Sequence, residues 1–311
     1  MFSLYLPGLE SCAPEAGPGL PALESLVTRS RRRPASCSPW AQLAETFGGS
    51  LQRWPIGPVS ALADLQRPLR AALRVEPLGM MESEQGAFRL PAHTLAITRE
   101  EAAALAAAFN SALGSDGLQL LVAQPQRWYL ELDAASFQPE WAGFAVPAGM
   151  AAAEVLAPGR ALRRLLSEAE MLFHAHPVNT ARRDSGRPQV IGLHAWGGGA
   201  LHPPAPVDST SAACDANEEP YLAGLRRLGV VPPTANQPTA AGGVAWPVAA
   251  ESFHRGCLSD CEHAWGRPLL EGLRWGRLSR VTIVTAQAVY ETRRLDALKF
   301  WRRPQPLGGL T

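Results

Sequence analysis

Residues 164–204, RLLSEAEMLFHAHPVNTARRDSGRPQVIGLHAWGGGALHPP, are the most informative part of the sequence. Its first part carries apolar residues at three- and four-residue spacing, namely Leu165, Leu166, Ala169, Leu172 and Phe173. Such a stripe is typical of a helix that packs on a core. Pro177 has no amide hydrogen and disfavours helical geometry at the residue before it, so this helix should end near His176.

A strand and a glycine run follow this helix. Gln189 to Trp196 is predicted to be a buried strand, and because apolar residues occur on both of its faces we expect it to be central in its sheet. Gly197, Gly198 and Gly199 come directly after it. Three successive glycines let the backbone come close to either a ligand or another segment of the chain.

The polar residues of the stretch have two interpretations. In the first, the ends of the helix and the strand meet at one edge of the sheet and bind a phosphate or carboxylate. The ligand-binding residues would then be His174, His176, Asn179, Arg182, Trp196, Gly197, Gly198 and Gly199. In the second, the histidines cap a helix end, the glycines form a turn, and Arg182 pairs with a nearby acid such as Glu168 or Asp184. The stretch is neither a P-loop nor a dinucleotide-binding fingerprint, because it lacks the Gly-Lys-Ser/Thr and GxGxxG patterns.

The same stretch resembles a signature that two groups of proteins share. One group is the RpfE-type regulatory proteins of proteobacteria, often labelled phosphoglycerate mutase, and the other is the cofactor-independent phosphoglycerate mutases of archaeal type, which have it in an accessory region. The matching residues are Glu168, Met171, Leu172, His174, His176, Pro177, Val178, Asn179, Arg182, Gly186, Pro188, Trp196, Gly197 and Gly199. Further matches to the first group extend over most of the chain, at 116–118, 127–130, Trp265, 268–270 and 300–303.

The resemblance implies a phosphoglycerate-mutase-like regulatory or binding protein. The alternative is a phosphoglycerate-mutase-type isomerase acting on a phosphorylated small metabolite. The chain departs from the pattern at Glu76-Pro77-Leu78-Gly79, where Asp-Pro-Val-His is expected, and Ser167 and Glu170 replace an asparagine and a glutamine.

The catalytic core of the archaeal mutases resembles alkaline phosphatases, which need two metal ions and an activated hydroxyl nucleophile. Here the first predicted strand, Phe2 to Leu6, is followed by Pro7-Gly8-Leu9-Glu10, and no aspartate precedes Asp64. We therefore expect a pseudoenzyme without the two-metal core, without mutase turnover and without a cofactor.

One cluster could be offered as a metal site. His254, Cys257, Cys261 and His263 have the spacing H-x2-C-x3-C-x-H, which is not an established zinc pattern. If this segment is helical, the two cysteines lie one turn apart, where packing is the commoner role. We predict no metal ligands, although the sequence leaves this cluster open. The five cysteines and the lack of a signal peptide favour a reducing cytoplasm.

A chain of 311 residues can hold one large domain or two small ones. The alternation of predicted helices and strands indicates one α/β domain over residues 1–311, with a mixed sheet flanked by helices. We expect flexible loops near 10–39, 202–217 and 230–242. Predicted elements include helices around 59–73 and 98–113, a strand at 93–97 and a hairpin of 118–123 with 127–132. The net charge of +1 gives no reason to expect nucleic acid or membrane binding, so the expected partners are a phosphate- or carboxylate-bearing small molecule and a protein.

Overall fold

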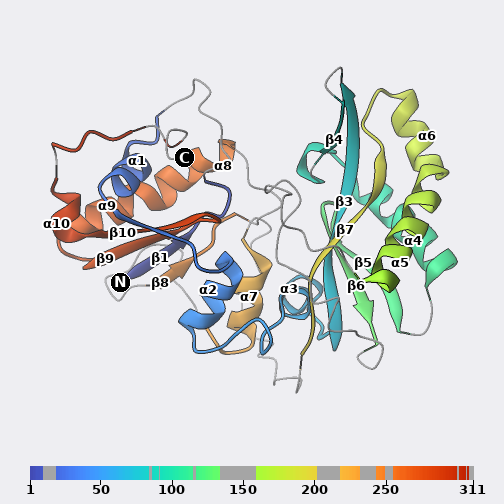
Figure 1. The fold of residues 1–311 in the computed structure, drawn as a ribbon, viewed down its shortest axis with the longest axis horizontal. Helices are drawn as coiled ribbons and strands as arrows, with labels where there is room; N and C mark the ends of the chain where they lie inside the picture. Colours follow the sequence, from blue (N-terminus) through green and yellow to red (C-terminus); the bar gives the residue numbers. More distant parts are fainter. Residues whose placement is uncertain are drawn as a thin grey trace. The chain divides into compact units, whose positions relative to one another are not determined.

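The computed structural model describes residues 1–9, 19–83, 86–90, 92–114, 117–133, 159–201, 218–231, 243–248, 255–299, 301–305 and 307, without the side chains of 81–89 and 255. The chain divides into two compact units. Unit 1 comprises Met1–Leu43, Asp215–Glu219 and Pro232–Thr311, and unit 2 comprises Ala44–Cys214 and Pro220–Val231. Each unit has a sheet flanked by helices (Figure 1), so the predicted mixed α/β class is confirmed.

Unit 1 contains a mixed five-stranded sheet in the order β2-β10-β9-β1-β8. Strand β1 is parallel to β8 and β9, whereas β10 is antiparallel to β9 and β2. The strands are β1 (Phe2–Tyr5), β2 (Arg31–Pro34), β8 (Gly243–Ala245), β9 (Arg280–Val284) and β10 (Ala288–Arg293). The helices are α1 (Pro21–Thr28), α8 (Arg255–Cys261), α9 (Arg267–Arg274) and α10 (Arg294–Ala297), with a π-helical segment, Glu262–Gly266, between α8 and α9.

The alternation of β1 explains how this sheet is covered. Phe2 and Leu4 point into the main core of unit 1, to which α1 and α9 contribute from one face of the sheet (Figure 1). Tyr5 points to the opposite face, where its ring stacks on Trp246 with 5.0 Å between centroids. Trp40, at the start of α2 (Pro39–Thr46), packs on the same indole.

Unit 2 contains an antiparallel sheet in the order β4-β3-β6-β5, and β7 pairs with β3. The strands are β3 (Ala71–Ser83), β4 (Gly86–Leu90), β5 (Leu118–Gln124), β6 (Arg127–Leu132) and β7 (Val190–Ala200). The helices are α3 (Ile56–Leu65), α4 (Arg99–Leu113), α5 (Arg160–His174), α6 (Pro177–Asp184) and α7 (Pro220–Arg227). Helices α4, α5 and α6 lie on one side of the sheet, and α3 lies on the other (Figure 1).

Several predicted elements are confirmed and others are wrong. Thr98 and Glu101 form the expected capping box of α4, and β5 and β6 form the expected hairpin. The helix predicted for 59–73 ends at Leu65, because the chain enters β3 at Ala71. The strand predicted for 93–97 is instead a short 3₁₀ turn, Ala92–Thr94. The described part of the loop expected near 10–39 contains α1 and β2, because Leu23, Leu26 and Val27 form an apolar face that the core buries.

The central strand of unit 2 is β3, so the prediction that residues 189–196 are central is wrong. Among the described residues, β7 pairs with β3 alone, whereas β3 also pairs with β4 and β6. Strand β7 is nonetheless buried, because α5 covers one of its faces and α3 the other. Its two apolar faces are explained by the helices that cover them. A strand covered in this way has the same sequence pattern as a strand in the centre of a sheet, so the pattern alone cannot distinguish the two.

The expected loop at 202–217 lies outside the described residues, and so does the expected loop at 230–242 except for its first two residues. The prediction of a single domain stays a prediction, because the division into two compact units does not show whether each unit folds independently. No helix in the described part of the chain is long and apolar enough to cross a membrane.

Candidate functional site

The predicted motif HPVN joins two helices to a strand. Helix α5 ends at His174 and α6 begins at Pro177, whose missing amide hydrogen is tolerated at a first helical position. His176 is the N-cap of α6, and its Nδ1 accepts a hydrogen bond from the amide of Val178 at 3.2 Å. His174 is exposed and His176 is half-buried. The predicted helix end is therefore confirmed, and a second helix that was not predicted, α6, lies between it and β7.

Asn179 is fully buried and uses both ends of its amide group. Its Nδ2 donates to the carbonyls of Phe173 at 2.7 Å and Val190 at 2.8 Å. Its Oδ1 accepts from the amide of Val190 at 2.9 Å. The side chain therefore ties the end of α5 and the start of β7 to α6.

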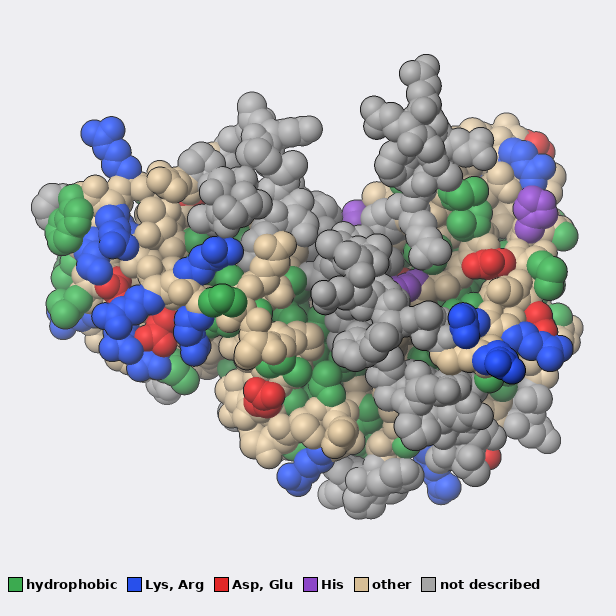
Figure 2. Space-filling view, in the orientation of Figure 1, with side chains coloured by type: hydrophobic (Ala, Val, Ile, Leu, Met, Phe, Trp, Pro, Cys, Tyr) green, Lys and Arg blue, Asp and Glu red, His purple; other side chains and the backbone are tan. Residues whose placement is uncertain are grey.

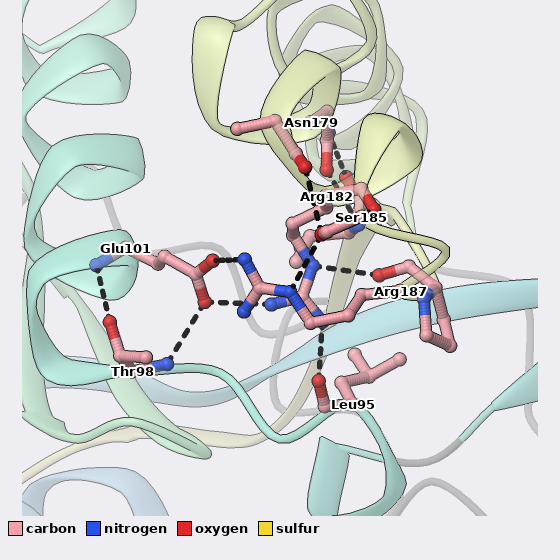
Figure 3. A network of polar contacts seen from close by, with 10 residues as sticks. Leu95, Thr98, Glu101, Asn179, Arg182, Ser185 and Arg187 are labelled. Carbon is pink, nitrogen blue, oxygen red and sulfur yellow. Dashed lines mark hydrogen bonds and ion pairs between the residues drawn. The ribbon is translucent and has the colours of Figure 1, made fainter.

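Arg182 is also fully buried, and each of its three nitrogens donates to a protein oxygen (Figure 3). Nε donates to the carbonyl of Pro188 at 2.7 Å, Nη1 to Oε2 of Glu101 at 2.7 Å, and Nη2 to the carbonyl of Leu95. The other oxygen of Glu101 pairs with Arg187 at 2.9 Å. The prediction that Arg182 pairs with Glu168 or Asp184 is wrong, because its acidic partner is Glu101. Glu168 pairs with Arg164.

The two motifs that were expected to meet lie at different ends of β7. Asn179 binds Val190, where β7 begins, and Trp196 lies six residues further along the strand. At a strand rise of ~3.3 Å per residue the two motifs are separated by about 20 Å. The predicted convergence at one sheet edge is therefore wrong. Anion binding by Asn179 and Arg182 stays a prediction that their buried internal contacts argue against.

The glycine run approaches another segment of the chain. It lies inside β7, which continues to Ala200, and not after the strand as predicted. A Cβ atom at Gly199 would lie 2.1 Å from Cβ of Pro55, and one at Gly197 would lie 2.9 Å from Cβ of Ile56. Of the two possibilities left open by the sequence, close packing against the start of α3 is the one observed.

Trp196 takes part in a buried polar row on the α3 side of the sheet, which the sequence did not reveal. Its Nε1 donates to Oε1 of Glu76 at 2.9 Å, and the guanidinium carbon of Arg74 lies 4.8 Å from its ring centroid. All three side chains are almost completely buried. Glu76 belongs to the segment that replaces Asp-Pro-Val-His, so this departure from the family pattern falls on a residue that binds Trp196.

The row continues to a second buried pair. Arg127 donates to both carboxylate oxygens of Asp64, at 2.6 and 2.9 Å, and the hydroxyl of Tyr129 donates to Oδ2 at 2.5 Å. Burial of the phenol, together with the charge of Asp64, raises the pKa of Tyr129 well above its ordinary value. The hydroxyl therefore keeps its proton and acts as a donor within the fold.

The structure describes Cys257, Cys261 and His263 of the candidate metal cluster, and their neighbour Glu262 has a structural role. Both carboxylate oxygens of Glu262 accept hydrogen bonds at 2.9 Å from the first amides of α1, those of Ala22 and Leu23. His263 contacts the carbonyl of Ser259 through Nδ1 at 2.7 Å, and burial raises the pKa of Cys261 to about 12. His254 lies outside the described residues. Within the described residues, no three His, Cys, Asp or Glu side chains are grouped to hold a metal ion.

A cavity of about 530 Å³ in unit 1 gathers positive charge, and the sequence analysis missed it. The side chains around it are Val27, Thr28, Ser30, Arg32, Tyr290, Trp301, Arg302, Arg303 and Gln305. Among the described residues, none of these three arginines forms an ion pair, and no acidic side chain lines the cavity. Lys and Arg side chains also gather over the part of unit 1 that carries α10 and β9 (Figure 2).

The fold brings this arginine cavity together from three segments. Val27 and Thr28 are the last residues of α1, and Ser30 follows shortly after it. Arg32 on β2 is paired in register with Tyr290 on β10, which places both side chains on one face. Trp301, Arg302 and Arg303 come from the C-terminal segment. Trp301 is 66% exposed. Strand β2, in the basic run at 29–33, supplies Arg32 to the cavity.

A second cavity, in unit 2, has mixed charge. It is about 940 Å³ and is lined in part by Arg70, Glu131 and Asp133. Carboxylates at its wall repel an anion, so this cavity is a weaker candidate for an anionic ligand than the arginine cavity.

Comparisons with known proteins give distant structural likenesses. No family model matches the chain, and no curated protein matches it. The structure of a cofactor-independent phosphoglycerate mutase from Thermoplasma acidophilum DSM 1728 is similar over 94% of this chain and 89% of that one, with 17% identity and a TM-score of 0.37. The PH0037 protein from Pyrococcus horikoshii is similar over 94% and 87%, with 14% identity and a TM-score of 0.44. Likenesses this distant carry no statement about the activity of this chain.

Proposed function

We propose that this chain is an RpfE-type, phosphoglycerate-mutase-like regulatory or binding protein, which recognises a phosphate- or carboxylate-bearing small molecule and does not turn it over. The family part of this proposal rests on the sequence resemblance. The ligand part rests on one observation: around the cavity of unit 1 lie three arginines that form no ion pair with any residue the structure describes. We propose that it acts in the cytoplasm, where Cys37, Cys257 and Cys261 would persist as thiols.

Charge and geometry support anion binding at the arginine cavity over anion binding at the HPVN motif, residues 176–179. Guanidinium groups bind phosphate and carboxylate through paired hydrogen bonds, and they do so best when no protein carboxylate competes. Arg32, Arg302 and Arg303 meet this condition, whereas Arg182 has Glu101 as its partner. The cavity volume also falls within the ~300–1,000 Å³ that small-molecule sites occupy.

Calorimetry on the full chain tests the proposal. Titration with pyrophosphate and with 3-phosphoglycerate should show saturable binding of at least one of them. The double variant Arg302→Gln/Arg303→Gln should weaken that binding by about tenfold or more, because two charge-assisted contacts are lost. The matched control is Arg160→Gln/Arg163→Gln, which removes the same charge from two exposed arginines of α5 and should leave the affinity unchanged. Absence of saturable binding at millimolar ligand contradicts the proposal.

A mutase assay separates this proposal from the enzyme alternative. We expect no turnover of 3-phosphoglycerate above background, with or without added manganese. A metal-dependent rate that follows the protein through purification and is lost in a point variant would establish the alternative, a phosphoglycerate-mutase-type isomerase.

A further inference from the structure

We infer that the arginine cavity binds a ligand with two or more phosphate groups and a planar ring, such as a nucleoside di- or triphosphate, with the ring on Trp301. This inference rests on the proposed function and narrows its ligand class. It follows from the charge of the cavity, the exposure of one indole and the way the surrounding segment is held.

The charge of the cavity exceeds what one singly charged group would neutralise. Arg32 approaches from β2, whereas Arg302 and Arg303 come from the C-terminal segment, so the three positive charges lie on two separate walls. The nearby acids are engaged elsewhere, since Glu291 pairs with two other arginines and Asp296 pairs with Lys299 at 2.5 Å. A di- or triphosphate carries enough charge and enough acceptor oxygens to contact both walls.

Buried Arg29 adds to the positive charge behind the cavity. It is 6% exposed, and within the described part of the chain its hydrogen bonds go to two backbone carbonyls and to no carboxylate. Burial, and then the charge of Arg274, lower the pKa of Arg29, although a guanidinium keeps its charge at neutral pH. An uncompensated buried cation in this position favours an anionic ligand nearby.

Trp301 supplies a stacking surface at the same cavity. An indole is a large apolar group that proteins generally bury, yet 66% of this residue is exposed while it lines the cavity beside three arginines. Exposed aromatic rings next to arginines are the usual means of binding a nucleobase, because every base offers a planar face.

The wall that carries Trp301 is anchored to the body of unit 1. Arg29 donates through Nη1 to the carbonyl of Ala297 at 2.8 Å and through Nε to that of Arg302 at 3.4 Å. The amide of Gln305 donates to Oγ1 of Thr28 at 3.0 Å, and Leu307 is buried in the core. A segment held in this way loses little conformational freedom on binding, which favours affinity for a small ligand.

The test compares three probes on the full chain by calorimetry: pyrophosphate, adenosine triphosphate and a single-stranded oligonucleotide. Adenosine triphosphate should bind about tenfold or more tightly than pyrophosphate, the gain expected from one stacked base. Trp301→Ala should abolish this advantage and leave pyrophosphate affinity unchanged. Trp275→Ala is the matched control, because that tryptophan is 77% exposed and lies outside the cavity. Arg302→Gln/Arg303→Gln should weaken both small ligands, and circular dichroism should show that each variant is folded.

The outcomes distinguish this inference from the proposed function. If pyrophosphate binds through the two arginines but adenosine triphosphate binds no more tightly, or if Trp301→Ala changes nothing, the ring-binding inference is overturned and the anion-binding proposal stands. If neither small ligand binds, the ring-binding inference is overturned, and the proposed function is overturned with it when 3-phosphoglycerate also shows no saturable binding. If the oligonucleotide binds more tightly than adenosine triphosphate and depends on the same arginines, the cavity is part of a nucleic-acid surface, and the inference is again overturned.

Discussion

Asn179 joins three parts of unit 2 through one amide group, and this explains why an asparagine suits the position. At the end of α5 the carbonyl of Phe173 accepts from the amide of His176 at 3.0 Å as well as from Asn179, and the first residue of β7 offers both an amide and a carbonyl. One side chain with a donor end and an acceptor end satisfies all three groups. Aspartate has no donor for the carbonyls, and a longer side chain would have to fit the same buried space.

Replacing Asn179 with alanine should therefore destabilise the protein. The amide and the carbonyl of Val190 would lose their contact with this side chain, and the carbonyl of Phe173 would lose one of its donors, so we expect the free energy of unfolding to fall by about 2–4 kcal/mol. Urea denaturation followed by circular dichroism measures this as a lower midpoint. Thr180→Ala is the control, because Thr180 is the exposed neighbour on the same helix. Equal midpoints for the two variants would show that the amide contacts do not contribute to stability.

Tyr129 predicts a pH dependence of stability. Burial and Asp64 raise its pKa in the folded state above the ordinary value of 10, so above that pH the folded state retains a proton that the unfolded state loses. The contribution to stability is thus complete below about pH 10 and falls as the pH rises further. Tyr129→Phe should make the decline above pH 10 less steep, as measured by urea denaturation across this range. The prediction fails if the same variant lowers the tyrosinate absorbance that folded protein gains near pH 10.

For the polar network around Arg182, the sequence predicted the local features and missed the contacts between distant residues. Pro177 predicts a helix boundary, and the Thr98 capping box places Glu101 in the first turn of α4, because both signals involve neighbouring residues. The pairing of Arg182 with Glu101 joins residues 81 positions apart, and no pattern within either segment indicates it. The arginine cavity was missed for the same reason, since its walls come from widely separated parts of the chain.

At the scale of elements, one helix is capped by a residue from another. The N-cap position of α1 is Leu20, which has no side-chain acceptor, and Pro21 follows it. Glu262 supplies the missing acceptor from the π-helical segment between α8 and α9, with Arg267 at 3.7 Å from its carboxylate. A negative charge at a helix N-terminus is favourable. The buried carboxylate of Glu262 therefore stabilises α1 and fixes the contact between α1 and the π-helical segment.

Glu262→Gln should weaken this contact while keeping the shape of the side chain. An amide has one acceptor oxygen in place of two and no charge, so we expect a loss of about 1–2 kcal/mol in the free energy of unfolding. Glu271→Gln on α9 is the matched control, because its side chain is exposed and the charge change is the same. Thermal denaturation of the two variants side by side measures the difference. A melting temperature for Glu262→Gln no lower than that of the control would contradict the capping role.

Strand β3 shows why part of the fold could not be predicted from periodicity. Its segment 71–78 presents apolar residues to one face, but the other face contains Arg74 and Glu76, which are buried in the polar row. A pattern search takes charged residues as marks of an exposed face or a turn, so it missed the central strand of unit 2. These buried charges are compatible with a strand because both contact Trp196. Glu76 accepts a hydrogen bond from its indole, and the guanidinium of Arg74 lies over its ring.

At the scale of the whole molecule, unit 1 is assembled from the two ends of the chain and unit 2 from its middle. The residues of unit 2 bury their own core between β3, β5, β6, β7 and the helices α4 and α5. The core of unit 1 is built from residues 2–27 and 245–307. Each unit therefore contains what a domain needs, a sheet with its own buried apolar face.

We expect the segment 44–231 to fold when it is expressed alone, because its sheet and core are complete within it. The isolated segment should show a cooperative thermal transition, and Asn179→Ala should lower its midpoint as it does in the full chain, since every partner of Asn179 lies within this segment. This outcome would contradict the single-domain prediction made from the sequence. An isolated segment that shows no cooperative transition, together with limited proteolysis of the full chain that yields no stable fragment, would instead support one domain whose two cores depend on each other.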